Sequence, residues 1–342
     1  MPVTWSWSFG PETGAQLNNQ MGWGCSTNAN SVEPRTTYVY TYSGSAERYS
    51  LVTDPAEAVN LPANCFNPEG WVSIPIYMDT TGLSILGANT INIRGNSSGR
   101  NIYIQFDGSA AKLYVDNVLK EVTTSLNLFN QWNYFSLKYT MTGSDWGGQL
   151  YLNGSPVTAF QQDPQSAEIG GIISFAGKGN GDRVNYFGQV ILHNSMADTG
   201  EVPRYVTRIQ PTVDTSENGT WNPSSGSDNF KVLSGSFDAS SFTRCAPSSN
   251  GNNVVCQSQN IGTQIGASIT AIDGITIHTF SSGTGQNAFA ALSDDNLTYA
   301  EGVTITPSLS TTSYAFATSG SQPSDNASWT ISSNLFLKYE VS

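Results

Sequence analysis

Short stretches in which apolar and polar residues alternate recur along the first 204 residues of the chain. Because the side chains of a strand point alternately to its two faces, this two-residue period predicts half-buried β-strands. The pattern covers residues 37–42, 71–77, 101–106, 111–115, 133–139, 149–152, 171–175 and 186–192. Helical periodicity is nearly absent, and a single helical turn is expected near 54–60. The pattern therefore predicts an all-β chain.

The last third of the chain repeats one arrangement at two places, residues 208–226 and 325–336. Each begins or ends with apolar sequence and contains a polar turn rich in Gly, Pro or Asn that holds one tryptophan, Trp221 or Trp329. The polar, Pro-bearing stretch at 198–203 lies between this region and the earlier strands and has the character of a linker. We therefore expect two β-domains, at residues 1–204 and 205–342.

The pattern of the first domain is sharpest between Gln131 and Val157. Trp132 leads a strand, a Gly-rich gap follows at 143–148, and Gln149-Leu-Tyr-Leu152 runs into an Asn153-Gly154 hairpin turn. From about residue 70 to 195 this order resembles the concanavalin A-like or laminin G-like family. The resemblance implies a jelly-roll sandwich of two antiparallel sheets, and many members of that family bind sugars or proteins.

The pattern of the second domain resembles a different family. Arg208 and Pro211 lie on a first strand, Gly219-Thr-Trp-Asn-Pro-Ser-Ser-Gly226 forms a turn, and Trp329-Thr330 follows an acidic residue near the end. Over roughly residues 204–342 this resembles a C-terminal domain of many tailed-bacteriophage structural proteins. The resemblance implies a smaller β-sandwich that belongs to a virion and carries no active site.

Composition narrows the classes of partner. Charged residues make up 12% of the chain, about half the usual share, and the net charge is −12. The two parts carry −6 each, with 10 basic and 16 acidic residues before residue 205 and 4 and 10 after it. No basic patch is available to follow phosphates, so nucleic acids and membrane surfaces are excluded as partners. The start of the chain has no secretory signal pattern, so assembly in a host cytoplasm is expected.

Catalytic chemistry is not expected. Glycosidases of the concanavalin-like type place acidic residues on one strand as Glu-x-Asp-x-x-Glu, and this chain contains no such run. The two histidines, His193 and His278, fall in predicted strands, where a structural side chain is the favoured interpretation over a catalytic triad. We therefore predict that the protein is not an enzyme and has no catalytic residues.

Eight tryptophans raise the alternative of sugar stacking. Trp146 lies in a Gly-rich stretch, and together with Asp145 and Asn153 it is the candidate glycan-binding site; burial under a loop or in an interface is the competing interpretation. Trp5, Trp7 and Trp23 have similarly polar surroundings. By contrast, Trp71 and three further tryptophans occupy family-like core positions. We expect the latter to be structural: Trp132, Trp221 and Trp329.

Cysteines and acidic pairs leave two questions open. Cys245 and Cys256 are equidistant from Asn250-Gly251, so a two-residue hairpin turn there would place them opposite each other; a disulfide and two separate buried thiols are both retained. Asp294-Asp295-Asn296 is read either as half of a calcium site or, preferably, as a strand-joining turn. The family resemblance also leaves calcium open on the rim of the first sandwich, near Asp145 and Asp182. Otherwise no cofactor is expected.

These patterns together predict a non-enzymatic structural protein of a tailed-phage virion. A capsid decoration or head-fibre protein that displays a lectin-like domain is the first expectation; a tail-associated adhesin and a free carbohydrate-binding lectin-like module are the alternatives. Expected partners are capsid or other virion proteins, sister subunits in a trimer, and a host-surface glycan. The alternating face of Trp5, Trp7 and Phe9 must be covered by the chain's own core, by a sister subunit or by the capsid.

Overall fold

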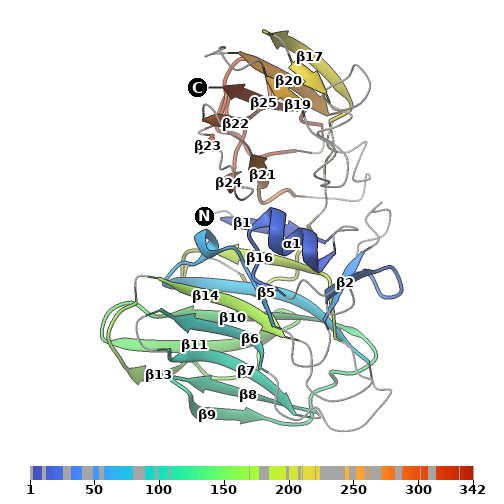
Figure 1. The fold of residues 1–342 in the computed structure, drawn as a ribbon. Helices are drawn as coiled ribbons and strands as arrows, with labels where there is room; N and C mark the ends of the chain where they lie inside the picture. The colour runs from blue at the N-terminus through green and yellow to red at the C-terminus, as the bar shows by residue number, and fades with distance from the viewer. Residues whose placement is uncertain are drawn as a thin grey trace.

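A computed structural model shows two β-structured regions stacked end to end (Figure 1). The first is built from residues 3–197, and the second from residues 209–341. The residues that the structure describes are 3–9, 13–25, 32–40, 49–53, 58–79, 89–96, 99–107, 109–168, 170–176, 185–197, 200–206, 209, 211–219, 221–223, 243–245, 252–258, 261, 271–281, 287–300, 302–306, 313–330 and 332–341.

The first region is a sandwich of two antiparallel sheets. Within the described residues, the larger sheet has ten strands: β1 (Trp5–Ser8), β2 (Val32–Arg35), β3 (Ser50–Thr53), β5 (Glu69–Met78), β10 (Trp132–Thr140), β11 (Asp145–Leu152), β12 (Ser155–Pro156), β13 (Gln161–Pro164), β15 (Asn185–Phe187) and β16 (Gln189–His193). The smaller has six: β4 (Ala58–Asn60), β6 (Asn89–Gly95), β7 (Asn101–Asp107), β8 (Ala110–Val115), β9 (Val118–Thr123) and β14 (Gly171–Ala176). The predicted all-β jelly-roll sandwich is confirmed.

The core of this sandwich follows from strand alternation. On β5, Val72, Ile74 and Ile76 are fully buried, and on its neighbour β10 so are Phe135 and Leu137. Every second residue of each strand therefore faces the other sheet, whose β6 and β7 contribute isoleucines to the same core. The residues in between lie on the outer face of the larger sheet, and this outer face positions the candidate site.

The N-terminal aromatic strip belongs to this core. β1 pairs with β16, with Trp5 opposite Leu192 and Trp7 opposite Val190. The rings of Trp5, Trp7 and Phe9 are buried and pack around Trp23. This strip was expected to be buried by the chain's own core, by a sister subunit or by the capsid, and burial in the chain's own core is observed. The strip is therefore no longer a physical reason for the expected trimer, which itself stays a prediction.

One helix was not predicted from the sequence pattern. α1 (Gly14–Met21) begins at Thr13, whose side chain and that of Gln16 cap each other's backbone N–H groups. It ends at Gly22 in the left-handed conformation. Thr-x-x-Gln followed by a glycine was the available signal. The helical turn expected near 54–60 is wrong for the described residues there, because Ala58–Asn60 form β4, which pairs with β14. A one-turn 3₁₀ helix, η1 (Ala63–Cys65), follows it.

Two strand predictions also need correction. Residues 37–40 form no strand; they lie over the outer face of the larger sheet, and 41 and 42 are outside the described residues. The strand expected at 186–192 is divided at Gly188 into β15 and β16. A side chain at Gly188 would collide with Tyr40, whose Cβ would lie 2.4 Å from the added Cβ. The remaining expected strands coincide with strands of the structure.

The second region is a smaller β-sandwich. A five-stranded sheet contains β17 (Val213–Asn218), β20 (Asn253–Ser258), β25 (Leu335–Val341), β22 (Ala288–Ser293) and β23 (Val303–Ile305). Two two-stranded sheets accompany it: β18 (Trp221–Pro223) with β19 (Thr243–Cys245), and β21 (Ile275–Ser281) with β24 (Ser313–Ser319). Trp329 is buried against Ile277, Leu292 and Leu335 in the core between them.

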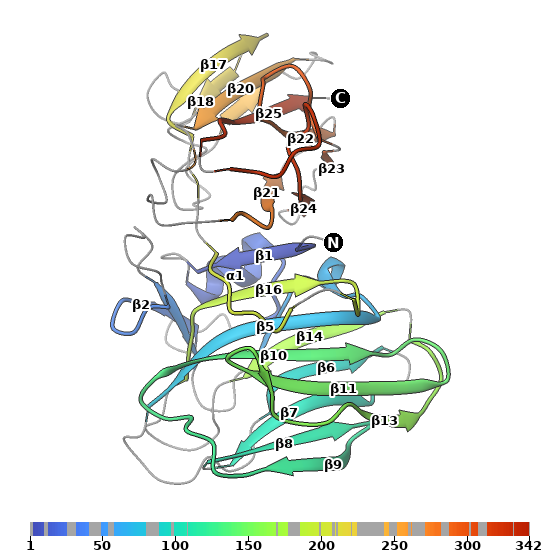
Figure 2. The ribbon, with the colours of Figure 1, turned by 180° about the vertical axis from the view of Figure 1, so that it is seen from behind.

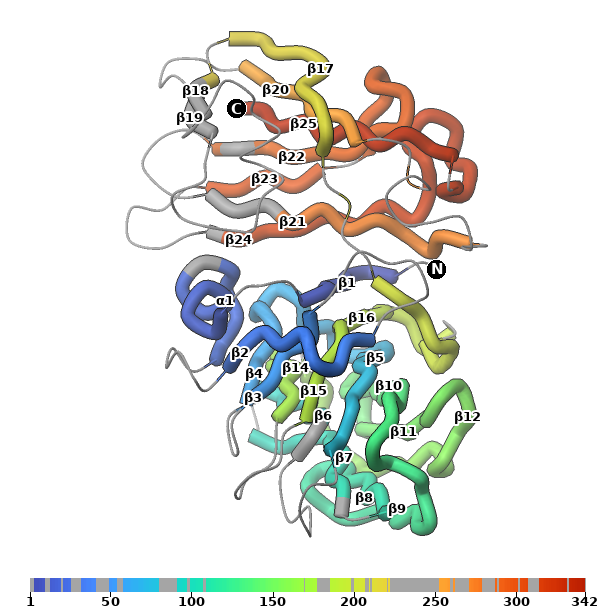
Figure 3. Tube along the Cα trace, turned by 90° about the vertical axis from the view of Figure 1, so that its right-hand side faces the viewer, coloured from blue at the N-terminus to red at the C-terminus, as the bar shows by residue number. Residues whose placement is uncertain are grey.

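The two regions meet where β1 lies against β21 and β24, as Figure 3 shows. Trp5 Nε1 donates to the Tyr314 hydroxyl at 2.9 Å, and the Thr318 hydroxyl donates to the backbone oxygen of Thr4 at 2.8 Å. His278 lies 2.8 Å from the Ser6 backbone oxygen and 2.9 Å from the Tyr314 hydroxyl. Because the carbonyl of Ser6 can only accept, Nε2 of His278 is assigned as the donor of this hydrogen bond.

No sheet among the described strands contains members from both sides of residue 200. Strands up to His193 belong to the first sandwich, and strands from Val213 belong to the second. That residues 1–204 and 205–342 fold as separate domains stays a prediction.

Of the two alternatives retained for Cys245 and Cys256, the disulfide is not formed. β20 lies between β17 and β25, so Cys256 is opposite Asp214 and Leu337, whereas Cys245 is on β19 opposite Trp221. Cys256 is a buried free thiol that donates to the Asp214 carboxylate at 3.3 Å. Burial, together with this carboxylate, raises the pKa of the thiol. The Asn250-Gly251 turn lies outside the described residues.

Candidate functional site

The outer face of the larger sheet carries a row of aromatic side chains across three adjacent strands. Trp132 on β10 is opposite Tyr77 on β5, and Tyr77 is opposite Tyr186 on β15. The rings of neighbouring residues contact each other, with centroids 5.8 Å apart for Trp132–Tyr77 and 6.0 Å for Tyr77–Tyr186. All three side chains are only partly buried. The sequence therefore places aromatic faces side by side on an accessible sheet surface.

The segment after β2 adds two tyrosines to this row. Tyr38 stacks on Tyr77 with centroids 4.0 Å apart and also meets Tyr186 edge-on at 4.8 Å. Tyr40 meets the edge of Trp132 at 5.4 Å. Such stacked and edge-to-face contacts hold aromatic rings in place beyond the effect of burial alone. We call Tyr38, Tyr40, Tyr77, Trp132 and Tyr186 the aromatic platform.

Burial raises the pKa values of three platform tyrosines, Tyr40, Tyr77 and Tyr186. Desolvation, then Tyr38 and Asp79, raise the pKa of Tyr77 to about 12. Desolvation and Asp79 also raise the pKa of Tyr186, and desolvation is the main cause that raises the pKa of Tyr40. At neutral pH these three hydroxyls therefore keep their protons and can both donate and accept a hydrogen bond.

Polar groups border the platform. Arg35, at the end of β2, is paired with Glu33, and its charge lowers the pKa of Tyr186 against the stronger effects that raise it. Asp79 follows β5 and acts on both Tyr77 and Tyr186. Gln131 precedes Trp132 and is bound to the backbone of Asn127. An apolar surface ringed by charged and amide groups is the usual composition of a small-molecule site.

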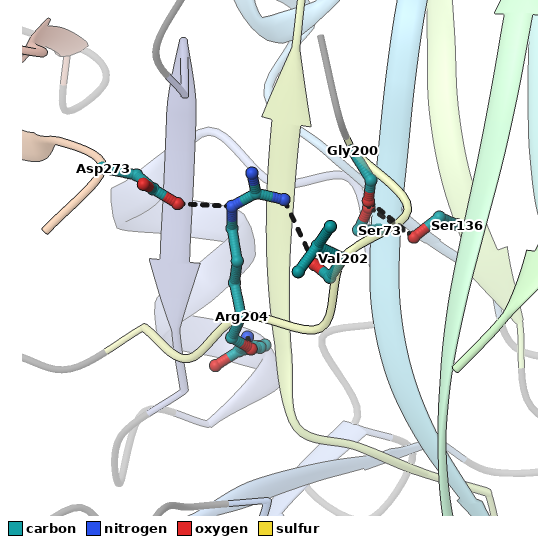
Figure 4. Close-up of polar contacts among 7 residues, drawn as sticks. Ser73, Ser136, Gly200, Val202, Arg204 and Asp273 are labelled. Atoms are coloured by element: carbon teal, nitrogen blue, oxygen red, sulfur yellow. Dashed lines mark hydrogen bonds and ion pairs between the residues drawn. The ribbon is translucent and has the colours of Figure 1, made fainter. Parts of the chain in front are cut away.

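The other half of the same sheet face is covered by residues 200–206, which we call the strap (Figure 4). The backbone oxygen of Gly200 lies 2.9 Å from the hydroxyls of both Ser73 and Ser136. A Cβ at Gly200 would be 2.5 Å from the ring of Trp71, so only glycine allows the strap to lie this close. The strap thereby buries Trp71.

The strap continues to the edge of the platform and to the second sandwich. Gln189 binds both the backbone oxygen of Arg204 and the N–H of Val206, at 2.6 Å each. The guanidinium of Arg204 donates to Asp273 at 2.5 Å. Tyr205 stacks on Tyr40 with centroids 4.8 Å apart and is 49% exposed. Beside the strap, the platform is partly accessible and Tyr205 is exposed.

The structure separates the predicted glycan-binding residues. Trp146 is 1% exposed, faces the core and donates its Nε1 to the backbone of Ser166, so its predicted stacking role is corrected. Asp145 is at the same end of β11, opposite Pro164. Asn153 is at the far end, about 23 Å from Trp146 by strand rise, and its side chain accepts from the N–H of Tyr134. The three residues form no common site.

The burial of several other tryptophans also differs from what the sequence predicted. Trp23, like Trp5 and Trp7, is buried and offers no exposed face. Trp329 is buried, as its structural role requires. Trp132 and Trp221 are only partly buried. The expected core position is therefore wrong for Trp132, which belongs to the platform. It is not seen for Trp221 either, whose indole N–H donates to the backbone oxygen of Asn218.

The remaining candidates for chemistry have structural explanations. His193 and His278 both lie on strands, as expected. Asp295 accepts from the N–H groups of Leu297 and Thr298, which lowers the pKa of its carboxyl group. Asp294 binds Ser324 instead, so this pair closes a turn after β22, the preferred interpretation. Among described residues no group of three or more His, Cys, Asp or Glu could hold a metal ion. Asp182 lies outside them.

Comparisons with known proteins add the following. The sequence matches no protein-family model and no curated protein. The carbohydrate-binding module CBM66 from Bacillus subtilis is 13% identical and covers 50% of this chain and 95% of its own, with a TM-score of 0.32. Domain 4 of AbnA, an extracellular arabinanase from Geobacillus stearothermophilus in complex with arabinotriose, is 11% identical. The match covers 56% of this chain and 91% of that domain, with a TM-score of 0.38.

The catalytic domain of a glycoside hydrolase family 131 protein from Coprinopsis cinerea is 13% identical and covers 59% and 98%, with a TM-score of 0.39. All these scores are below 0.5, so we base the fold on its own strand order and draw no functional argument from them. Nothing in these matches points to a phage origin. No helix in the described part of the chain has the length and apolar character needed to cross a membrane.

Proposed function

We propose that the protein is a non-enzymatic, lectin-like carbohydrate-binding protein whose platform binds a glycan. The observation that supports this is the partly buried aromatic platform, in which Tyr38 stacks on Tyr77 of the row Trp132–Tyr77–Tyr186 and Tyr40 meets the edge of Trp132. The apolar faces of sugar rings pack on aromatic rings, while sugar hydroxyls need nearby donors and acceptors. The phenols of the platform and its polar border supply both.

The row suits several sugar units better than one. Adjacent strands are about 4.8 Å apart, so the three residues span roughly 10 Å across the sheet. Each strand contributes one ring, and together they form a track rather than a closed pocket. The charge of the chain, −12, disfavours polyanionic glycans. A neutral oligosaccharide or polysaccharide is therefore the proposed ligand.

Binding of neutral glycans tests this proposal. The purified chain is screened on a glycan array, and affinities for the retained sugars are measured by calorimetry. Trp132→Ala and Tyr77→Ala should each weaken binding tenfold or more, because aromatic residues dominate contact energies of this kind; tenfold equals about 1.4 kcal/mol. Unchanged affinity in both variants, or a parent that retains no sugar on the array, would overturn the proposal.

The smaller sheet offers a matched control. Tyr103 on β7 and Tyr114 on β8 stack with centroids 4.3 Å apart on the outer face of that sheet. They are also partly buried tyrosines on strands of the same sandwich. Tyr103→Ala should therefore leave glycan affinity unchanged. A loss equal to that of Tyr77→Ala would place the binding site elsewhere.

Absence of hydrolysis is part of the same proposal. Its support is the absence of a Glu-x-Asp-x-x-Glu run from the sequence. Calcium has no role in the proposal, because Asp294 and Asp295 are engaged in a turn. Incubation with the bound glycan should release no shorter product; turnover that one acidic substitution abolishes would contradict this.

We further propose that the protein is displayed on a tailed-phage virion after assembly in the host cytoplasm, as a capsid decoration or head-fibre protein. The support is the sequence pattern of residues 204–342 alone, with its Gly-x-Trp-x-Pro-Ser-x-Gly turn and Trp329-Thr330. Its partners would be capsid proteins, and many copies would raise adhesion to a host-surface glycan through avidity. A tail-associated adhesin and a free module are the alternatives; peptide mass spectrometry of purified virions separates them.

A further inference from the structure

One exposed aromatic ring lies beside the platform without belonging to it. Tyr205 of the strap stacks on Tyr40, with centroids 4.8 Å apart and an angle of 18° between the ring planes. The side chain of Tyr205 is nevertheless 49% exposed. Stacking uses one face of the ring, and the exposed remainder of the side chain is available to a ligand that already lies on the platform.

Ring contacts join Tyr205 to the row of the platform. Tyr40, on which Tyr205 stacks, meets the edge of Trp132 with centroids 5.4 Å apart. Trp132 in turn contacts Tyr77, with centroids 5.8 Å apart. A continuous series of aromatic contacts thus leads from the middle of the larger sheet to the strap. A ligand that extends past Trp132 over Tyr40 meets Tyr205 next.

Gln189 fixes the backbone on both sides of Tyr205. Its Nε2 donates to the backbone oxygen of Arg204, and its Oε1 accepts from the N–H of Val206, both at 2.6 Å. The side chain of Gln189 is itself buried, and its strand β16 is paired with both β1 and β5. An amide suits this place because it offers one donor and one acceptor to two peptide groups. Buried polar groups that are satisfied in this way hold a segment in one conformation.

A second attachment of the strap reaches the other sandwich. The guanidinium of Arg204 donates to the carboxylate of Asp273, and Figure 2 shows the strap crossing β16 on its way to that sandwich. The side chain of Asp273 is 48% exposed, so this ion pair contributes little by itself. Removal of the buried amide of Gln189 would instead leave two peptide groups without their partner, which costs more. Gln189 therefore has the larger part in setting the position of Tyr205.

We propose that Tyr205 is a further glycan-contacting residue beside the platform and that Gln189 is its positioning residue. This role rests on the proposed glycan binding and extends the binding surface from the sheet onto the strap. The ligand class stays a neutral oligosaccharide, and a long one gains more from the added ring than a short one. A ring that is already stacked, on a backbone that is already held, loses little conformational freedom when the ligand binds.

Calorimetry with the longest neutral oligosaccharide retained on the glycan array measures the contact. Tyr205→Ala should weaken the affinity about fivefold, because it removes one aromatic contact. Tyr205→Phe keeps the ring and should bind like the parent. Val202 is the matched control, since it is 47% exposed on the same strap, and Val202→Ala should leave the affinity unchanged. An equal loss in this control, or no loss in Tyr205→Ala, would overturn the contact.

A double-mutant cycle separates positioning from general structural support. Gln189→Glu keeps the shape of the side chain but replaces its N–H donor with an oxygen, so the bond to the backbone oxygen of Arg204 is lost. It should weaken glycan affinity in the parent and have no further effect in Tyr205→Ala, because both residues act through one contact. Gln189→Ala, which removes both bonds, repeats the cycle. Equal effects in the two backgrounds would overturn the positioning role.

Trp132→Ala separates a site confined to the platform from one that extends onto the strap. If Trp132→Ala and Tyr205→Ala both lose affinity while Val202→Ala does not, the binding surface includes the strap. If only Trp132→Ala loses affinity, the proposed glycan binding stands and the role of Tyr205 is refuted. A parent that retains no sugar refutes both. Thermal unfolding of each variant shows that the compared proteins are folded.

Discussion

The two sandwiches are built with unequal cores. The first surrounds Trp5, Trp23, Trp146, Phe106 and Phe135, all nearly or fully buried, with aliphatic residues from both sheets. The described core of the second contains Trp329, with Tyr339 packed against it, among smaller aliphatic side chains. The apolar area that leaves water on folding is the main stabilising contribution, so the first region should be the more stable of the two.

The junction extends this difference. The β21–β24 pair of the second sandwich rests on β1 of the first, through Trp5, Ser6 and Thr4. The second region therefore gains part of its support from a surface that the first has already formed. A domain with a small core can thus gain stability by packing against a neighbouring domain. We therefore expect the same kind of core substitution to destabilise the two sandwiches unequally.

The largest effect is expected from removing the ring of Trp329. Trp329→Ala should lower the free energy of unfolding of the second sandwich by about 3–5 kcal/mol, since a buried tryptophan leaves a large cavity. Phe135→Ala costs a similar amount in the first sandwich, where the larger core remains. Hydrogen exchange resolved by peptide should show the second region opening in Trp329→Ala while the first stays protected. Equal loss of protection in both regions would contradict unequal cores.

A smaller effect is expected at the junction. Tyr314→Phe removes the hydroxyl that accepts from Trp5 and is hydrogen-bonded to His278, and should cost about 1–3 kcal/mol because buried partners lose their hydrogen bonds. Thermal unfolding followed by calorimetry measures the loss. Tyr299→Phe is the control, since its hydroxyl binds Asn296 in a turn beside the exposed Leu297. A greater loss in the control would exclude the junction as a source of stability.

Alkaline pH should weaken the first sandwich through Tyr134. Burial raises the pKa of this phenol to about 12, above the ordinary value of 10. The unfolded chain therefore releases the proton first, so the stabilising contribution is complete below pH 10 and is lost as the pH rises towards 12. At pH 11 the loss is about 1 kcal/mol. Tyr134→Phe should lack this part of the pH dependence in denaturant titrations; an identical slope would refute it.

The smallest effect is expected in the exposed turn of the second sandwich. The N–H groups of Thr298 and Leu297 hold the pKa of Asp295 below 3.8, so its contribution is present above that pH and is lost as the pH falls through the folded value. Asp295→Asn should slightly lower the melting temperature at pH 7 and leave it unchanged near pH 2. A difference that grows in acid would have the wrong sign.

Strand alternation could have distinguished the two tryptophans that sequence analysis misplaced. Trp146 and Leu150 are an even number of residues apart on β11, so both side chains point inward. Trp132, Ser136 and Lys138 are likewise an even number of residues apart on β10, and their side chains point outward. The prediction instead relied on the polar or apolar character of neighbouring residues in the chain. A Gly-rich neighbourhood indicated exposure for Trp146, although those glycines only let the strand pack closely.

The rest of the platform could not be derived from local sequence. Tyr38 and Tyr40 meet Tyr77 and Trp132 only because the segment after β2 folds back over the sheet. Their alternation predicted a strand, since tyrosines that cover a sheet and tyrosines within a sheet have the same spacing. Likewise Cys256 was paired by turn position, and tertiary placement of β20 between β17 and β25 decided otherwise.

The position of β1 also sets an order of events during synthesis. Thr4 bonds to Leu192, which is 188 residues later, and Trp5 bonds to Tyr314, which is 309 residues later. β1 precedes the other described strands in the chain, so during synthesis it waits longest for its partners, and its aromatic strip stays uncovered in the meantime. A chain truncated before β16 would lack the strand that pairs with β1 and would leave this strip as a binding site for chaperones.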